Sequence, residues 1–309
     1  GYQISYMNSG KMTNKGWEFR VDAVPFQNKD WRVGVYFNIA HNENKITEMP
    51  DNYIEENYTF GNGNYAYRRE EGRPMGSFYG YRYKGVCQNK DATYARDADG
   101  NVMKDISGNA IVMRNGTATI APGDALYEDI NHDGVINQYD IVYLGNSNPR
   151  FTGGAGVNVS YKQFKLSAIF YGRYGQDVVN STRLNNESMR GIDNQSTAVL
   201  RRWRNEGDQT DIPRALYGEG YNTLGSDRFV EDASYLRLKS LSFNYRLPKK
   251  IIQRWGFSNI DVYVTGYNLF TWTKYTGQDP EVKTENTYAR DSATTPASIQ
   301  LVAGFNLSF

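Results

Sequence analysis

The sequence predicts an all-β protein, a portion of a large antiparallel β-barrel that spans a membrane and carries long loops on one side. Apolar residues recur at every second position, which gives a pleated strand one apolar and one polar face. Most of these runs approach the roughly 10 residues that a tilted strand needs to cross a bilayer. The connections between them are long and polar, and structureless connections of that length are rare in compact soluble domains.

The composition excludes several other classes of protein. Lysine and arginine number 35 and aspartate and glutamate 34, for a net charge of +1, so no basic field indicates nucleic-acid binding. No stretch approaches the roughly 18 uninterrupted apolar residues of a membrane helix. The 25 tyrosines and 30 glycines are unlike a disordered chain and fit short strands with wide loops. Because the chain starts at Gly1 without an export leader, we expect a fragment.

The first strands are predicted near the N-terminus. A short strand is expected at residues 2–8. Between residues 17 and 23 the odd positions are apolar and the even positions are charged, and residues 33–39 repeat the alternation. The linker 25–30 has the length of a hairpin connection, so the two longer runs should be antiparallel neighbours.

Further runs are expected as strands at residues 78–86 (the weakest), 157–161, 164–170, 235–247, 260–264 and 297–309. In 235–247 the apolar positions change phase, and a β-bulge near Lys239 would explain the change. The last run alternates cleanly and stops on Phe309. The total of about nine strands is odd, whereas bacterial single-chain barrels have even numbers, which indicates that the rest of the cylinder lies elsewhere.

Long polar connections occupy much of the remaining chain, at residues 42–77, 87–150, 175–233 and 277–296. Outer-membrane barrels show this asymmetry, with short turns on one side and long loops on the other. The alternative is a soluble β-sandwich, in which alternation arises because one face of each sheet packs on a core. Aromatic residues near strand ends favour the barrel, because such rings suit membrane interfaces. Examples are Trp31, Phe270 and Trp272.

The most specific local motif is the segment DINHDGVINQYD at residues 129–140, which fits a calcium-loop template in all but its last position. Oxygen ligands recur at alternate residues, as a hard cation requires. The expected ligands are Asp129, Asn131, Asp133, the carbonyl oxygen of Val135, and Asp140. The closing aspartate is shorter than the usual glutamate, and the alternative is a metal-free turn rich in Asp and Asn. We expect a structural Ca²⁺ that stiffens a long outer loop.

No catalytic constellation is visible in the sequence. One cysteine, Cys87, and two histidines leave little material for a zinc site or a histidine-based triad. Carboxylate pairs such as Glu70 and Glu71 fit a solvated loop better than acid–base work on sugars. No phosphate-binding loop, dinucleotide fingerprint or nucleophile elbow is present. We therefore expect a protein that is not an enzyme.

Several segments together resemble the SusC/RagA family of TonB-dependent outer-membrane transporters, the barrel half of glycan or peptide importers of Bacteroidota. As an ordered set they extend over nearly the whole chain. The segments are NKGWE (14–18), EGRPMGSFYGY (71–81), the loop 123–149, DRFVEDASYLRL (227–238), NLF (268–270) and YTGQDPE (275–281).

The resemblance implies a 22-stranded barrel in the whole protein, of which residues 1–309 would be roughly the C-terminal third. The N-terminal plug domain and the segment that contacts TonB would have no counterpart here. The calcium-loop-like stretch at 123–149 would be an insertion in an extracellular loop. Outward apolar side chains would meet lipid, and polar side chains would line a hydrated lumen. This inward set includes Arg20, Asp22, Arg32 and Asn38.

The same resemblance implies a place, a function and partners. The protein would lie in the bacterial outer membrane and import oligosaccharides, with peptides as the second choice. It would work with a SusD-like surface lipoprotein and draw energy from TonB–ExbB–ExbD through the N-terminal part. Phe309 would be read by the barrel-assembly machinery during biogenesis.

Substrate contacts vary within the family, so the aromatic loop residues Trp203, Tyr217 and Tyr221 are named only as guesses for sugar stacking. Loop aromatics more often pack within their own loop. Two rival interpretations stay open at this point. One is a soluble calcium-stabilised carbohydrate-binding β-sandwich, and the other is a fragment of a glycoside hydrolase.

Overall fold

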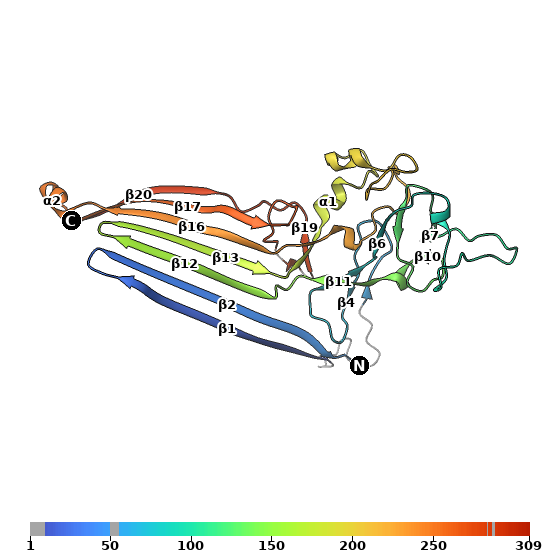
Figure 1. Ribbon diagram of the computed structural model, residues 1–309, viewed down its shortest axis with the longest axis horizontal. Coiled ribbons are helices and arrows are strands. Elements are labelled where there is room, and N and C mark those ends of the chain that lie inside the picture. Colours follow the sequence, from blue (N-terminus) through green and yellow to red (C-terminus); the bar gives the residue numbers. More distant parts are fainter. Residues whose placement is uncertain (1–9, 50–55, 283, 286–287) are drawn as a thin grey trace, which may run out of the picture.

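The computed structural model describes residues 10–49, 56–282, 284–285 and 288–309, which form two regions. One is a long single-layered sheet, here called the wall, and the other is a group of folded loops beyond one end of it (Figure 1). The wall has seven strands, and each is antiparallel to its neighbour in the order of the chain. These strands are β1 (Lys11–Gln27), β2 (Trp31–Glu48), β12 (Phe151–Tyr161), β13 (Phe164–Tyr174), β16 (Tyr235–Arg246), β17 (Asn259–Thr273) and β20 (Gln300–Ser308).

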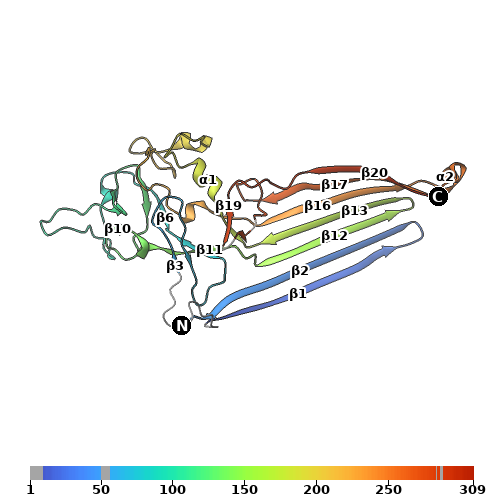
Figure 2. The ribbon, with the colours of Figure 1, turned by 180° about the vertical axis from the view of Figure 1, so that it is seen from behind.

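Short connections join the strands at one end of the wall, the hairpin end, and long ones join them at the other, the loop end. Residues 28–30 connect β1 to β2, and residues 162–163 connect β12 to β13. The connection from β16 to β17 holds the short helix α2 (Lys249–Ile252) and the 3-10 turn η5 (Gln253–Trp255). Figure 2 shows these connections together, far from the loops. The predicted alternation of short and long connections is confirmed.

The predicted hairpin of the first two wall strands is also confirmed. Their pairing runs from Lys11 opposite Glu48 to Gln27 opposite Arg32. Both strands are longer than the alternating runs at 17–23 and 33–39, because the hydrogen-bonded ladder continues into residues of mixed polarity. The strand expected at residues 2–8 lies outside the described part of the chain.

The predicted bulge lies at Lys239. Leu238 and Ser240 pair with residues of both neighbouring strands, whereas Lys239 has no partner in either ladder. One extra residue in a strand shifts the phase of every side chain beyond it. As a result, Leu238 and Leu241 lie on the same face of the wall despite their odd spacing, opposite Phe170 and Ala168 respectively.

The prediction of a strand at residues 78–86 as part of the wall is wrong. This stretch forms two short strands among the loops, β5 (Ser77–Gly80), which pairs with β11 (Val142–Asn146), and β6 (Tyr83–Val86), which pairs with β9 (Ala125–Tyr127). All four residues of β5 are buried, so both of its faces meet protein. A strand of the wall has an apolar and a polar face, and β5 differs because protein covers both of its faces.

The long connections are folded rather than structureless. Four clusters of buried side chains form their core in the described residues; one surrounds Tyr79, Tyr81 and Tyr127, and another surrounds Phe78 and Phe229. No helix in the described residues is long and apolar enough to cross a membrane. The remaining short elements are β3 (Glu56–Asn57), β4 (Tyr67–Arg68), η1 (Asp91–Thr93), β7 (Arg114–Asn115), β8 (Ala118–Thr119), β10 (Val135–Ile136), η2 (Gln138–Asp140), β14 (Asp177–Asn180), α1 (Ser181–Asn186), η3 (Thr197–Arg201), η4 (Asp227–Phe229), β15 (Val230–Asp232), β18 (Thr284–Glu285) and β19 (Tyr288–Asp291).

Candidate functional site: the two faces of the wall and its loop end

Side chains of opposite character form continuous rows on the two faces of the wall. Strand register brings one apolar residue from each strand into line, namely Phe26, Val33, Val159, Leu166, Phe243, Val264 and Ala303. The next row toward the hairpin end, on the opposite face, is polar apart from its last member, and consists of Gln27, Arg32, Ser160, Lys165, Asn244, Tyr263 and Gly304. Because successive side chains of a strand alternate in direction, the wall has one apolar and one polar face throughout.

No second layer formed by the described residues buries the apolar face. Phe243 is 45% exposed, Val264 50% and Phe305 67%. In a soluble sandwich these positions would meet the facing sheet and lose nearly all of their exposure. Within the described residues, the wall therefore lacks the facing sheet that a soluble β-sandwich requires.

Aromatic rings mark both ends of the apolar face. At the hairpin end Trp31 lies beside Tyr161, with 4.3 Å between the ring centroids. At the loop end Trp17 lies beside Phe151, at 6.2 Å. Strand β12 begins at Phe151 and ends at Tyr161, and its 11 residues span roughly 33 Å, or about 25 Å in height at a tilt of about 40°. This height equals the apolar band of outer-membrane barrels, and its aromatic edges match their interfacial girdles.

At the loop end, the connection after β17 is held to the polar face of the wall by a buried cation. The side chain of Arg237 is 3% exposed, and its guanidinium donates to the carboxylates of Asp279 and Glu281 and, at 2.9 Å, to the hydroxyl of Thr271. Burial acts to raise the pKa of Asp279, but hydrogen bonds from the backbone amides of Ala297 and Glu281 and from Arg237 outweigh it and lower that pKa. Asp279 is therefore ionised at neutral pH, and its ion pair with Arg237, here called the clamp, is retained.

A second ion-pair network ties α1 to the same connection. Arg183 donates to Glu231 at 3.2 Å and to Glu187 at 3.0 Å. Glu231 also accepts from the backbone amide of Thr276 at 2.9 Å. Arg228 donates to Glu187 at 2.7 Å, and both of these side chains are almost completely buried. The loops that follow β13 and β17 thus form one joined structure.

Two polar cavities border this connection. The larger, of about 780 Å³, is lined by Ser147, Arg173, Asp279, Glu281, Val282, Arg290, Thr294, Thr295, Pro296 and Ala297. The smaller, of about 650 Å³, is lined by Asn180, Thr182, Arg183, Asn186, Glu187, Ser196, Arg201, Thr276, Gly277, Gln278, Asp291 and Ala293. Both contain guanidinium groups, carboxylates and hydroxyls, and no described aromatic side chain lines either. They can hydrogen-bond a polar guest but provide no ring for stacking.

No ring contact among the described residues joins the three aromatic residues guessed from the sequence. The ring of Trp203 packs against the backbone of Gly123, and its backbone amide bonds to the carbonyl of Ile212 at 2.9 Å. Tyr221 packs edge to face on Phe60 at 4.8 Å. Tyr217 is 75% exposed. Their role in substrate binding stays a prediction.

In the segment 129–140, the carboxylates bond to their own backbone. Asp129 accepts from the amide of Gly134 at 2.7 Å, and Asp133 accepts from the amide of Val135 at 2.8 Å. Asp140 is fully buried and accepts from the amides of Ile130 and Asn137, both at 2.8 Å. Burial raises the pKa of Asp140. Among the described residues, no group of three or more His, Cys, Asp or Glu side chains is arranged to hold a metal ion.

Comparison with known proteins identifies relatives along nearly the whole chain, although no family model matches. TonB-dependent receptor P3 of Formosa agariphila is 33% identical over 93% of this chain and 27% of its own length. Receptor P26 of the same organism is 30% identical over 91% of the chain. TonB-dependent receptor SusC of Bacteroides thetaiotaomicron is 26% identical over 98% of the chain and 27% of its own length. The chain thus spans about a quarter of the length of these relatives.

Solved structures of similar proteins also match nearly the whole chain. The RagAB peptide transporter matches with a TM-score of 0.69 and 27% identity over 98% of this chain and 30% of the solved chain. The RagAB peptide importer in its open-open state matches with a TM-score of 0.65 and 25% identity. Together with the apolar band and its aromatic edges, these matches place the chain in the bacterial outer membrane. Over nearly its whole length, the chain is similar to part of the barrel of SusC/RagA-like TonB-dependent transporters.

Proposed function

We propose that the protein containing this chain imports oligosaccharides across the outer membrane, with energy from TonB–ExbB–ExbD and a SusD-like lipoprotein at its outer mouth. The observation that carries the proposal is the pair of opposed rows that crosses all seven wall strands. Such a wall separates lipid from water, and a closed wall of this kind encloses a hydrated path. Relatives named TonB-dependent receptors support the energy source.

In this proposal the chain performs no covalent chemistry. The wall provides the lumen surface, and the connection held by Arg237 presents polar cavities where the strands end. Hydroxyls and amides there would exchange hydrogen bonds with a hydrated guest as it passes. Recognition of Phe309 by the barrel-assembly machinery belongs to the same proposal.

Peptides are a second candidate for the substrate. Both cavities carry guanidinium groups and carboxylates, which would pair with the opposite charges of a peptide and its termini. The solved structures that resemble this chain are described as a peptide transporter. Neutral sugars, in contrast, are commonly bound on aromatic rings, and no ring of a described residue lines either cavity.

Uptake measurements in the source bacterium test the proposal. The gene would be deleted, and uptake of labelled oligosaccharides and labelled peptides compared with the same strain carrying the wild-type gene. We expect one oligosaccharide class to be lost on deletion and also in a strain without TonB. Loss of peptide uptake alone would transfer the assignment to peptides, and unchanged uptake of both would refute import. Extraction without detergent would refute the membrane location.

We also propose a structural Ca²⁺ at residues 129–140, held by Asp129, Asn131, Asp133, the Val135 carbonyl oxygen and Asp140. The spacing of oxygen ligands and the left-handed backbone of Gly134, with φ of 81°, support it. Calorimetric titration of Ca²⁺ into the wild type and the Asp129→Ala and Asp133→Ala variants is the test. Both variants should lose the binding heat, whereas Asp97→Ala, which alters a similar turn elsewhere, should retain it. Equal binding heats in the wild type and all three variants would refute the proposed Ca²⁺ site.

A further inference from the structure

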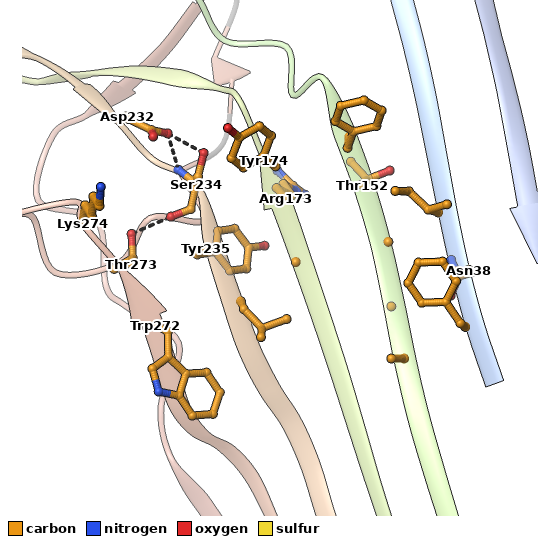
Figure 3. Close-up of a pocket in the computed structure, with 18 residues that line it drawn as sticks. Asn38, Thr152, Arg173, Tyr174, Asp232, Ser234, Tyr235, Trp272, Thr273 and Lys274 are labelled. Carbon is orange, nitrogen blue, oxygen red and sulfur yellow. Dashed lines mark hydrogen bonds between the residues drawn. The ribbon is translucent and has the colours of Figure 1, made fainter. Parts of the chain in front are cut away.

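A groove of about 660 Å³ lies on the apolar face of the wall near the loop end, where no described element covers it. Its floor consists of the small residues Gly153, Ala155 and Gly172. Aromatic side chains also line the groove, and Figure 3 labels Tyr174 and Trp272 among them. Besides these small residues, the aromatic and aliphatic residues that line the groove are Phe37, Ile39, Phe151, Tyr174, Tyr235, Leu236 and Trp272.

The floor of the groove is low because of how the strands pack. Gly153 lies opposite Gly172, so two neighbouring strands lack a side chain at the same level. A Cβ atom at Gly153 would lie 2.5 Å from the carbonyl oxygen of Asn38, and one at Gly172 would lie 2.7 Å from that of Tyr235. Both distances are too short for any side chain. The hollow is therefore built into the backbone of the wall.

The depth of the groove places it within hydrocarbon. It extends from Phe151, in the aromatic ring at the loop end, to Ala155. Four residues of a tilted strand correspond to a depth of roughly 10 Å. The backbone of this part is paired in the ladder on both sides, so the floor offers no free polar group. An empty hollow would lose its dispersion contacts, and a flexible hydrocarbon chain restores them.

A cation lies at the upper end of the groove. Lys274 is exposed and lies beside Thr273 and Asp232 (Figure 3). Asp232 accepts hydrogen bonds from the amide and hydroxyl of Ser234. No carboxylate of a described residue lies within ion-pairing distance of Lys274. The groove thus joins an apolar trough in the membrane to a polar rim that carries Lys274 and, bonded to Ser234, Asp232.

We propose that this groove binds one acyl chain of an outer-leaflet lipid whose phosphorylated headgroup lies beside Lys274. The long connections mark the loop end as the outer side of the membrane, so the occupant comes from the outer leaflet. The charge of Lys274 complements a phosphate, and the trough complements the attached chain. This site faces away from the lumen and is independent of the transported substrate.

Native mass spectrometry of the full-length transporter in detergent, with added lipid A, tests the proposal. Lys274→Gln should lower the fraction of protein that retains lipid about fivefold, because one lysine near a lipid surface contributes about 1 kcal/mol. Lys29→Gln, at the hairpin end, should leave retention unchanged. Lipid A without its phosphates should bind the wild type as weakly as intact lipid A binds Lys274→Gln.

A second pair of variants tests the trough. Ala155→Trp fills the groove and should abolish retention, whereas Ala23→Trp, on the same face but outside the groove, should not. Equal retention by Lys274→Gln and Lys29→Gln, or by phosphorylated and dephosphorylated lipid, would overturn the proposal. Dissociation of a dimer by Ala155→Trp with lipid retention unchanged would also overturn it, in favour of contact with a second copy.

Discussion

The wall and the folded loops differ in how far they bury their apolar side chains. In the loops Tyr81 and Phe229 are completely buried, whereas in the wall Phe243 and Val264 remain about half exposed. The loops therefore gain stability by removing apolar surface from water. The wall has no such core, and its order depends on paired strands and on lipid that accepts its apolar face. The loops are thus stable in water, whereas the wall requires lipid on its apolar face and water on its polar face. This is the two-solvent account of the molecule.

Removal of a loop core side chain should have the largest effect, and it should stay within the loops. Phe229 is completely buried beside Phe78 and Leu184, so Phe229→Ala should destabilise the loops by about 3–5 kcal/mol. Hydrogen exchange followed by mass spectrometry should show faster exchange in the loops and unchanged exchange in the wall. Ile106→Ala, at a fully exposed position, should change neither. Equal loss of protection in both regions would show that they are one cooperative unit.

A charge in the middle of the wall should distinguish its two faces. Val157 lies near the centre of β12 on the apolar face, and Asn158 follows it on the polar face. Val157→Arg should destabilise the barrel by about 2–4 kcal/mol, because it places a guanidinium in hydrocarbon. Asn158→Arg should stay within about 0.5 kcal/mol. The measurement is unfolding of the full-length protein in lipid bilayers, and similar losses for both variants would contradict the two-solvent account.

Acid should release the loop connection from the wall. The pKa of Asp279 is lowered in the folded protein, so its contribution to stability is present above the ordinary pKa of about 4 and is lost as the pH falls through the folded value. Fluorescence of Trp272, close to this connection in the chain, should be constant from pH 5 to 8 and change below about pH 4. Asp279→Asn should reduce that change. A transition near pH 6 would point to a different group.

The smallest effect concerns the single thiol. Burial, followed by the nearby carboxylate of Asp124, raises the pKa of Cys87 to about 11. At pH 7.5 almost none of it is thiolate, and the side chain is inaccessible. Iodoacetamide should therefore leave Cys87 unmodified until the loops unfold. Fast modification of the folded protein would mean that the loop core is open.

The wall is readable from the sequence because a period of two is a local property. The runs 17–23 and 33–39 identify their strands directly, and the phase change around Lys239 identifies its bulge. Segment 78–86 is misleading because its burial comes from distant residues. The amide of Tyr81, for example, bonds to the carbonyl of Gly225. The clamp cannot be predicted from the sequence either, since Arg237 and Asp279 are 42 residues apart and no local pattern indicates their pairing.

Accessibility of four consecutive positions in β12 tests the central claim most directly. Single cysteines at residues 157–160 of the full-length transporter, in lipid bilayers, would be labelled with a water-soluble maleimide and, in parallel, with a spin label sensitive to oxygen dissolved in lipid. We predict that Asn158→Cys and Ser160→Cys react from water, whereas Val157→Cys and Val159→Cys report lipid. Protection of residues 157 and 159 from both water and lipid would show that protein covers the apolar face and would contradict the account.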